Sequence, residues 1–278
     1  MSFLEIGKKK LEEWFEFVKG HYGKGRDSTL SIDKWFESMM HKSVKETTEH
    51  LDGARYKSAI KTGFFDLQRY LKWYLRKTGN NPNKKLMTEF IEIQTKLLAP
   101  ITPHLCEESW ETIGKKGFIS NAEWPKYDPK KIDPKAEYSE DLVERTATDI
   151  REVLGLVKVK AKQINLFVSE EWKYKFFAFV KKEIEKTRDV KDVIKSVMST
   201  DLKAHGKDIA SQVPQLVKDP SKLPQTILDQ KQEIKILQDS KAFLEKEFSC
   251  KVEILPADKS YSPRAKKAEP GKHGIEVV

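Results

Sequence analysis

The chain of 278 residues is poor in cysteine and has no long apolar run. Its two cysteines, Cys106 and Cys250, stand far apart, which excludes a disulfide framework and favours small buried thiols in a reducing cytosol. No stretch approaches the roughly 20 apolar residues that a membrane helix needs. The N-terminus also lacks the basic and apolar regions of a secretory signal. We therefore expect a cytoplasmic protein without a membrane partner.

Catalytic signatures are missing as well. The glycines at 20–25 lack the strand and helix context of a phosphate-binding loop. The six histidines have no metal-ligand spacing with one another or with cysteine. No Ser/His/Asp or Cys/His arrangement can be argued. We therefore expect no catalytic residue, no metal and no cofactor in this chain.

Positive charge is what the chain has in excess. The formal net charge is +9, and 34% of the residues are charged. A basic balance indicates a polyanionic partner such as nucleic acid. The excess is spread along both halves, however, as in many lysine-rich proteins that bind no nucleic acid, so charge alone does not decide the partner.

The first part of the chain has apolar residues at helical spacing, with glycine and proline signals between the stripes. Short connections between such helices are typical of an antiparallel bundle, which we place at residues 1–114. Proline, glycine and charge predict a linker over 115–138, anchored on the bundle by Trp124. The expected helices cover about 2–20, 32–51, 54–77, 86–97 and 103–114.

The second part changes character, and we expect a small α+β domain over 139–278. Alternating residues predict strands near 164–168 and 250–254, and a short edge strand at 275–277. A loop is expected between 256 and 274. The expected helices are 139–156, 170–186, 189–200, 202–213 and 227–248. The fold class is thus mainly α: an antiparallel helical bundle followed by a smaller α+β domain.

A proline corner over 99–110 joins two of the bundle helices. Pro100 cannot continue a helix. Thr102 is a good N-cap, and Pro103 suits the first helical position, where a missing N–H costs nothing. The pattern predicts two packed helices that meet at a defined corner, with His104 capping or packing there.

The helix expected at 54–77 has an apolar side and a basic side. Lys61, Arg69, Lys72 and Arg76 fall on the basic side of a helical wheel. Phe65 lies among them and Trp73 lies at the flank. Phosphates favour such a surface, and an aromatic ring can stack on an exposed base or ribose. The alternative is that the rings pack against a neighbouring helix and the cations are merely solvated.

Two further basic clusters lie in the second part. Lys158, Lys160 and Lys162 precede the first expected strand, where lysines can also serve to protect the edge of a sheet. The other cluster lies in the tail and contains Arg264, Lys266, Lys267 and Lys272. A disordered, solvated tail is the alternative interpretation of the second cluster.

Three segments in order, 31–35, 64–76 and 97–110, resemble the anticodon-binding helical bundle of class I aminoacyl-tRNA synthetases of the Leu/Ile/Val group. The run 73–76 is most similar to the leucyl enzyme. Segments 149–153, 164–168, 170–173, 242–248 and 268–271 resemble the C-terminal domain of the archaeal/eukaryal-type leucyl enzyme. The HIGH-like and KMSKS-like motifs and the editing domain of that family do not occur here.

The resemblance implies a non-catalytic tRNA-binding module, with ATP used only through a catalytic domain absent from this chain. The bundle would lie along the tRNA body, and the C-terminal domain would reach the long variable arm of leucine tRNA. The tRNA-binding residues implied are Lys61, Arg69, Lys72, Trp73, Arg76, Lys158, Lys160, Lys162, Lys266 and Lys267.

Two alternatives to this function stay open at the level of sequence. The chain can be a subunit of a split leucine–tRNA ligase that acts with a catalytic chain in trans. It can also be a stand-alone paralogue that serves as a helical interaction scaffold. Because it has no catalytic motif, we expect the chain to be inactive alone and to form part of a class I leucine–tRNA ligase.

Overall fold

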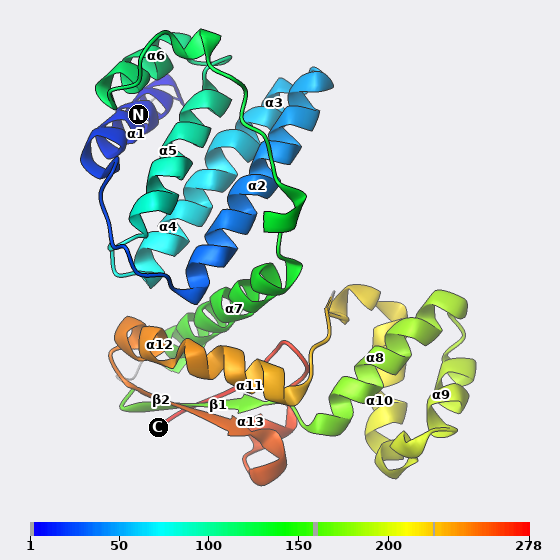
Figure 1. The fold of residues 1–278 in the computed structure, drawn as a ribbon. Helices are drawn as coiled ribbons and strands as arrows, with labels where there is room; N and C mark the ends of the chain where they lie inside the picture. The colour runs from blue at the N-terminus through cyan, green and yellow to red at the C-terminus, as the bar shows by residue number, and fades with distance from the viewer. Residues whose placement is uncertain (1–2, 158–160, 225) are drawn as a thin grey trace. The chain divides into compact units, whose positions relative to one another are not determined.

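The computed structural model describes residues 3–157, 161–224 and 226–278 (Figure 1). The chain divides into two units, 1–140 and 141–278, and the division falls within one helix. Helices dominate both units, and the second unit also contains a three-stranded sheet. The expected fold class, mainly α with a smaller α+β part, is confirmed.

The first unit is a helical bundle around an aromatic core. The rings of Phe36 and Tyr74 stack with centroids 4.3 Å apart, and Phe90 lies 5.2 Å from Phe36. All three side chains are fully buried. The elements are α1 (Phe3–His21), α2 (Ser31–Asp52), α3 (Tyr56–Ile60), η1 (Lys61–Asp66), α4 (Leu67–Lys77), α5 (Lys84–Leu98), α6 (Pro103–Thr112), η2 (Ile119–Asn121), η3 (Pro129–Lys131) and the start of α7 (Pro134–Val157).

The helix expected at 54–77 is not uniformly α-helical, because η1 is a π-helical turn between α3 and α4. Gly63 lies in this turn, where an added Cβ would stand 3.1 Å from Cγ2 of Thr47. The amide of Gln94, fully buried on α5, donates to the carbonyl oxygens of Gly63 (3.3 Å) and Phe64 (3.4 Å). A helical wheel of constant pitch therefore does not describe the side-chain directions around η1, because π-helical hydrogen bonds replace α-helical hydrogen bonds there.

Substitution of Gln94 by leucine is expected to lower the free energy of unfolding of the first unit by about 1–2 kcal/mol, since buried carbonyls lose a donor. Gln94 also accepts a hydrogen bond of 2.7 Å from Gln68. Urea unfolding measures the change. The matched control is Lys85→Leu, at an exposed position of the same helix. An equal effect of the two substitutions would show that Gln94 does not stabilise the π turn.

The proline corner is present, with one correction. Helix α5 ends at Leu98 and α6 begins at Pro103. Thr102 occupies the N-cap position but makes no capping hydrogen bond, because its hydroxyl donates back to the carbonyl of Leu98 (3.5 Å). His104 is exposed, so the expected capping or packing role for it is wrong.

The segment 115–138 lies within the first unit and is attached to α2. The indole N–H of Trp124 donates to the hydroxyl of Thr48 (2.9 Å), which is the anchoring expected for this tryptophan. The backbone N–H of Asp133 donates to the hydroxyl of Ser38 (2.7 Å).

The second unit is built on a sheet with the order β2-β1-β3. Strand β1 pairs parallel with β2 and antiparallel with β3. Because β1 has a neighbour on each side, the interpretation of Lys162 as protecting an edge strand is wrong. The elements are β1 (Gln163–Val168), α8 (Glu171–Lys186), α9 (Val190–Met198), η4 (Asp201–His205), α10 (Gly206–Lys218), η5 (Pro220–Lys222), α11 (Gln230–Asp239), α12 (Lys241–Phe248), β2 (Lys251–Pro256), η6 (Ala257–Lys259), α13 (Pro263–Lys266) and β3 (Gly274–Val277).

Some expected boundaries in this unit are wrong. The helix expected at 202–213 begins as η4 and continues as α10 to Lys218. The helix expected at 227–248 is two helices that meet at Ser240. The loop expected over 256–274 contains η6 and α13.

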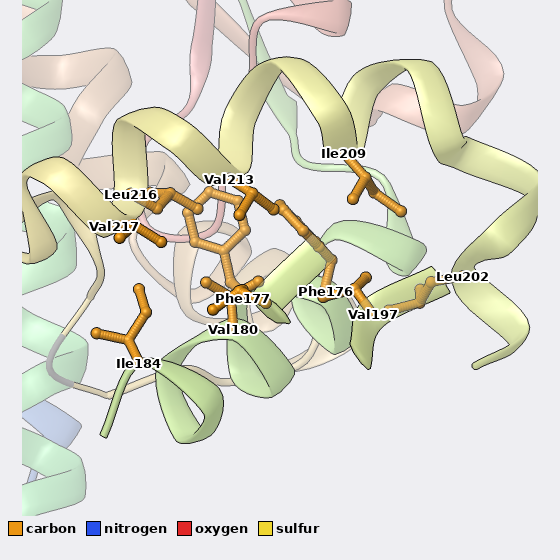
Figure 2. Close-up of a cluster of buried hydrophobic side chains, with 11 residues drawn as sticks. Phe176, Phe177, Val180, Ile184, Val197, Leu202, Ile209, Val213, Leu216 and Val217 are labelled. Atoms are coloured by element: carbon orange, nitrogen blue, oxygen red, sulfur yellow. The ribbon is translucent and has the colours of Figure 1, made fainter. Parts of the chain in front are cut away.

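Helices α8, α9 and α10 enclose their own apolar core. Figure 2 shows side chains of α10, such as Val213 and Leu216, facing Phe177 and Val180 of α8. Phe176, Val180 and Val213 have no exposed surface. This part of the unit is therefore stabilised mainly by burial of apolar surface.

Candidate nucleic-acid interface

Four cations on η1 and α4, which we call the basic face, are exposed: Lys61, Arg69, Lys72 and Arg76. The last three are spaced three and four residues apart on α4, so they lie on one side of that helix. Lys61 lies in the π turn, and its Nζ is 2.7 Å from Oδ2 of Asp66. This hydrogen bond raises the pKa of Lys61 and offsets part of its charge. Arg69, Lys72 and Arg76 are therefore the main part of the basic face.

Two of these cations make cation–π contacts with aromatic rings. Cζ of Arg69 lies 4.8 Å from the ring centroid of Tyr70. Cζ of Arg76 lies 5.3 Å from that of Trp73. Cation–π contacts of this kind orient a guanidinium over the ring.

The structure corrects the stacking role expected for Trp73. Its side chain is 5% exposed, and its indole N–H donates to Oε2 of Glu140 (3.1 Å). Lys77 pairs with the same carboxylate at 2.7 Å. No face of the Trp73 ring is open to a base. The exposed ring next to the basic face belongs to Phe65, which is 49% exposed, with Nζ of Lys10 6.0 Å from its centroid.

The basic residues of the second unit are placed only in part. Lys158 and Lys160 lie outside the described residues. Lys162 is exposed just before β1, and its backbone N–H donates to the carbonyl of Val278 (3.0 Å). Lys266 and Lys267 are exposed at the end of α13. Both border a cavity that does not include Lys162.

Among the described residues, no group of three or more His, Cys, Asp or Glu side chains could hold a metal ion. Every helix in the described ranges is too short or too polar to cross a bilayer. What the arrangement supplies is exposed positive charge together with the half-exposed ring of Phe65.

Comparisons with known proteins agree with the resemblance carried by the segments 31–35, 64–76 and 97–110. A family model described as the anticodon-binding domain of tRNA ligase matches residues 33–205. The leucine–tRNA ligase of Aeropyrum pernix is 33% identical over 95% of this chain and 27% of its own length. That of Pyrococcus horikoshii is 31% identical over 98% of this chain and 28% of its own length. The leucine–tRNA ligase of Methanocaldococcus jannaschii is 34% identical over 88% of this chain and 25% of its own length.

A solved leucyl-tRNA synthetase from Agrobacterium radiobacter, in a ternary complex with tRNA, matches 47% of this chain and 16% of its own chain, with 16% identity and a TM-score of 0.37. The chain thus spans about a quarter of the length of the curated relatives, and the similarity is to their C-terminal part. The chain belongs to the family of anticodon-binding domains of tRNA ligases.

Proposed function

We propose that this chain is a non-catalytic tRNA-binding module of a leucyl-tRNA synthetase in the cytoplasm. It positions leucine tRNA through the tRNA body and the long variable arm. The observation that carries the proposal is the exposed basic face on α4 in a chain of the anticodon-binding family. ATP and the aminoacylation chemistry belong to the catalytic part of such an enzyme, and this chain binds no cofactor.

Electrostatics support this function. Each phosphate that a lysine or arginine neutralises releases counterions, so binding strengthens as salt falls. Arg69, Lys72 and Arg76 present three such cations on one helix side. The net charge of +9 adds attraction at longer range. The similarity to synthetases over 95% of the chain does not favour a scaffold that lacks tRNA binding.

Substitution of Arg69, Lys72 and Arg76 together by alanine is expected to weaken tRNA binding about tenfold at moderate salt. The slope of log affinity against log salt concentration should become shallower by about two to three, one phosphate contact per cation. Filter binding at several salt concentrations measures both quantities.

The matched control replaces Lys116, Lys126 and Lys130, three exposed lysines of the same unit outside the basic face, by alanine. The control removes the same net charge but none of the proposed phosphate contacts. It should therefore flatten the slope of log affinity against log salt concentration much less. If both triple variants change affinity equally, only net charge matters. The basic face would then be ordinary solvated surface and the proposed site would be wrong.

Phe65→Ala is expected to weaken tRNA binding about threefold to tenfold without lowering stability, because a half-exposed ring can stack on a base or ribose. Phe65→Trp should restore binding. The control is Tyr56→Ala, another exposed ring of the same unit, on α3. Unchanged binding by Phe65→Ala would remove stacking from the proposal.

Specificity for leucine tRNA requires its own experiment. The affinity of the chain for leucine tRNA is compared with its affinity for the same tRNA lacking the long variable arm. Weaker binding of the shortened tRNA is expected. Equal, weak binding of both would refute the leucine-specific form of the proposal.

A further inference from the structure

We propose that His41 is an acid-sensitive latch, which holds the segment 124–133 on α2 and releases it when the imidazole is protonated. This segment, which we call the strap, runs along α2 and leads into α7 (Figure 1). The hydroxyls of Thr48 and Ser38 attach its two ends. His41 lies between these hydroxyls on the same side of α2, because positions 38, 41 and 48 are three and seven residues apart on one helix.

The attachment at His41 fixes the protonation state of its ring. The side chain is 4% exposed, and Nδ1 accepts a hydrogen bond of 3.1 Å from the backbone N–H of Asp128 in the strap. A ring nitrogen accepts only when it has no proton, so the ring is neutral and its proton is on Nε2. In the described part of the chain Nε2 has no hydrogen-bond partner, and Oε1 of Glu89 lies 3.9 Å from it. The strap amide is therefore bound by the neutral ring.

Protonation of His41 removes this acceptor. The added proton stands on Nδ1 and points at the backbone N–H of Asp128, so two donors face each other and the hydrogen bond is lost. A charged ring in a buried position is also unfavourable unless it is paired. Detachment of the strap gives the charged ring access to water. Acid therefore favours the detached strap.

The charged groups around the ring come from three helical elements and the strap. Glu37 on α2, Glu89 on α5 and Asp128 favour the protonated ring through their carboxylates. The ammonium of Lys131 in η3 opposes it. Nζ of Lys131 is 2.9 Å from Glu37 and 3.7 Å from Glu89, so it offsets both carboxylates. Burial, followed by Lys131, holds the pKa of His41 below its usual range.

The direction of the pH effect follows from this lowered pKa. Above about pH 6.5, the ordinary pKa of histidine, the ring is neutral whether the strap is attached or detached, and the attachment has its full strength. As the pH falls below that value, the detached state gains a proton that the attached state resists. The strap should therefore detach progressively in acid, while the aromatic core of the bundle, which does not use this hydrogen bond, stays folded.

Amide hydrogen exchange of the 278-residue chain tests the latch. The protection of the Asp128 amide, corrected for the intrinsic effect of pH on exchange, should fall about tenfold from about pH 7.5 to about pH 5.5. Protection within α5 should not change. NMR signals of the His41 ring nitrogens should show the neutral Nε2–H form at the higher pH. A ring with its proton on Nδ1 there, or equal corrected protection of Asp128 at both pH values, would overturn the proposal.

A variant without a titrating ring separates His41 from other acid effects. His41→Asn keeps an acceptor, because the amide oxygen can replace Nδ1, and protection of the Asp128 amide should then be the same at both pH values. The control is His104→Asn, at an exposed position on α6, which should retain the tenfold loss. If His41→Asn also retains the loss, another group causes it and the latch is wrong.

Glu89→Gln provides a second test that does not alter His41. It removes a carboxylate that favours the protonated ring, so the midpoint of the His41 ring titration followed by NMR should move to lower pH. Glu111→Gln, at an exposed position on α6, should leave the midpoint unchanged. A midpoint that stays the same or moves to higher pH in Glu89→Gln would contradict the proposal.

Discussion

Gly25→Ala is expected to lower the free energy of unfolding of the first unit by about 3–5 kcal/mol. Gly25 has φ +133°, a conformation that side chains with a Cβ rarely adopt. An added Cβ would stand 2.3 Å from the carbonyl oxygen of Pro82 and 2.9 Å from the backbone nitrogen of Lys84. Both neighbours are backbone atoms, so no side chain can move aside to make room.

The clash of the added Cβ would occur where backbone hydrogen bonds join the loop at Arg26 to the segment at 82–84. The backbone N–H of Arg26 donates to the carbonyl of Pro82 (2.8 Å), and that of Lys84 donates to the carbonyl of Arg26 (2.9 Å). The guanidinium of Arg26 also binds Asp33, which accepts a hydrogen bond of 2.6 Å from the hydroxyl of Tyr74. Displacement of Arg26 therefore disturbs a buried carboxylate as well as the loop.

Gly23 provides a close control for this substitution. It has φ +68° with nothing within 4 Å of an added Cβ. Gly23→Ala should then cost only about 1 kcal/mol, the penalty of the left-handed conformation alone. Urea unfolding of both variants gives the comparison. A Gly25→Ala variant no less stable than Gly23→Ala would show that the close approach to Pro82 does not exist in solution.

Glu233→Ala is expected to destabilise the second unit by about 3–5 kcal/mol, because it leaves several buried groups without their acceptor. Glu233 on α11 has no exposed surface and accepts hydrogen bonds from the backbone N–H of Gly271 (2.9 Å) and the hydroxyl of Tyr174 (2.7 Å). Nε2 of His273 lies 3.4 Å from Oε2 of Glu233, an electrostatic contact that falls short of a hydrogen bond. The other ring nitrogen of His273 is 2.9 Å from the hydroxyl of Thr146 on α7. Loss of the carboxylate therefore loosens the attachment of the tail to α7, α8 and α11.

Amide hydrogen exchange measures this loss where it occurs. Protection should fall most in β3 and near Gly271, and less in the core of α8–α10, which does not use Glu233. Glu233→Gln keeps the shape and one carbonyl acceptor, so it should cost less than Glu233→Ala. Glu185→Ala, at an exposed position of α8, is the control and should change little. Equal protection in Glu233→Ala and Glu185→Ala would contradict the role of the buried carboxylate.

Local patterns in the sequence predicted most of the helices and all three strands. The stripe that contains Phe64, Leu67 and Leu71 is buried as expected. The alternation around Ile164 and Val252 places both in paired strands. These features follow from propensity and periodicity within a few turns of chain, which is what a single sequence records well.

The errors in the candidate site have a different origin. The helical wheel placed Trp73 at the flank of the basic side, where its ring could stack on a base. In the structure its indole N–H donates a hydrogen bond to Glu140, 67 positions away in the sequence. The constant wheel itself fails because Gln94, on another helix, donates into the π turn. Both partners come from distant parts of the sequence, so no local window contains them.

The sequence by itself determined the helical bundle, the α+β part, the positive charge and the family. The tertiary structure alone decided which aromatic ring is exposed and whether the basic tail is ordered. Phe65 is available where Trp73 is not. The buried ammonium of Lys173 donates to the carbonyl oxygens of Lys266 (2.7 Å) and Ala268 (2.9 Å), so the interpretation of the basic tail as disordered is wrong. The physical reason is the same in each case: burial of a charged or polar group requires a partner. Folding, not sequence proximity, supplies that partner.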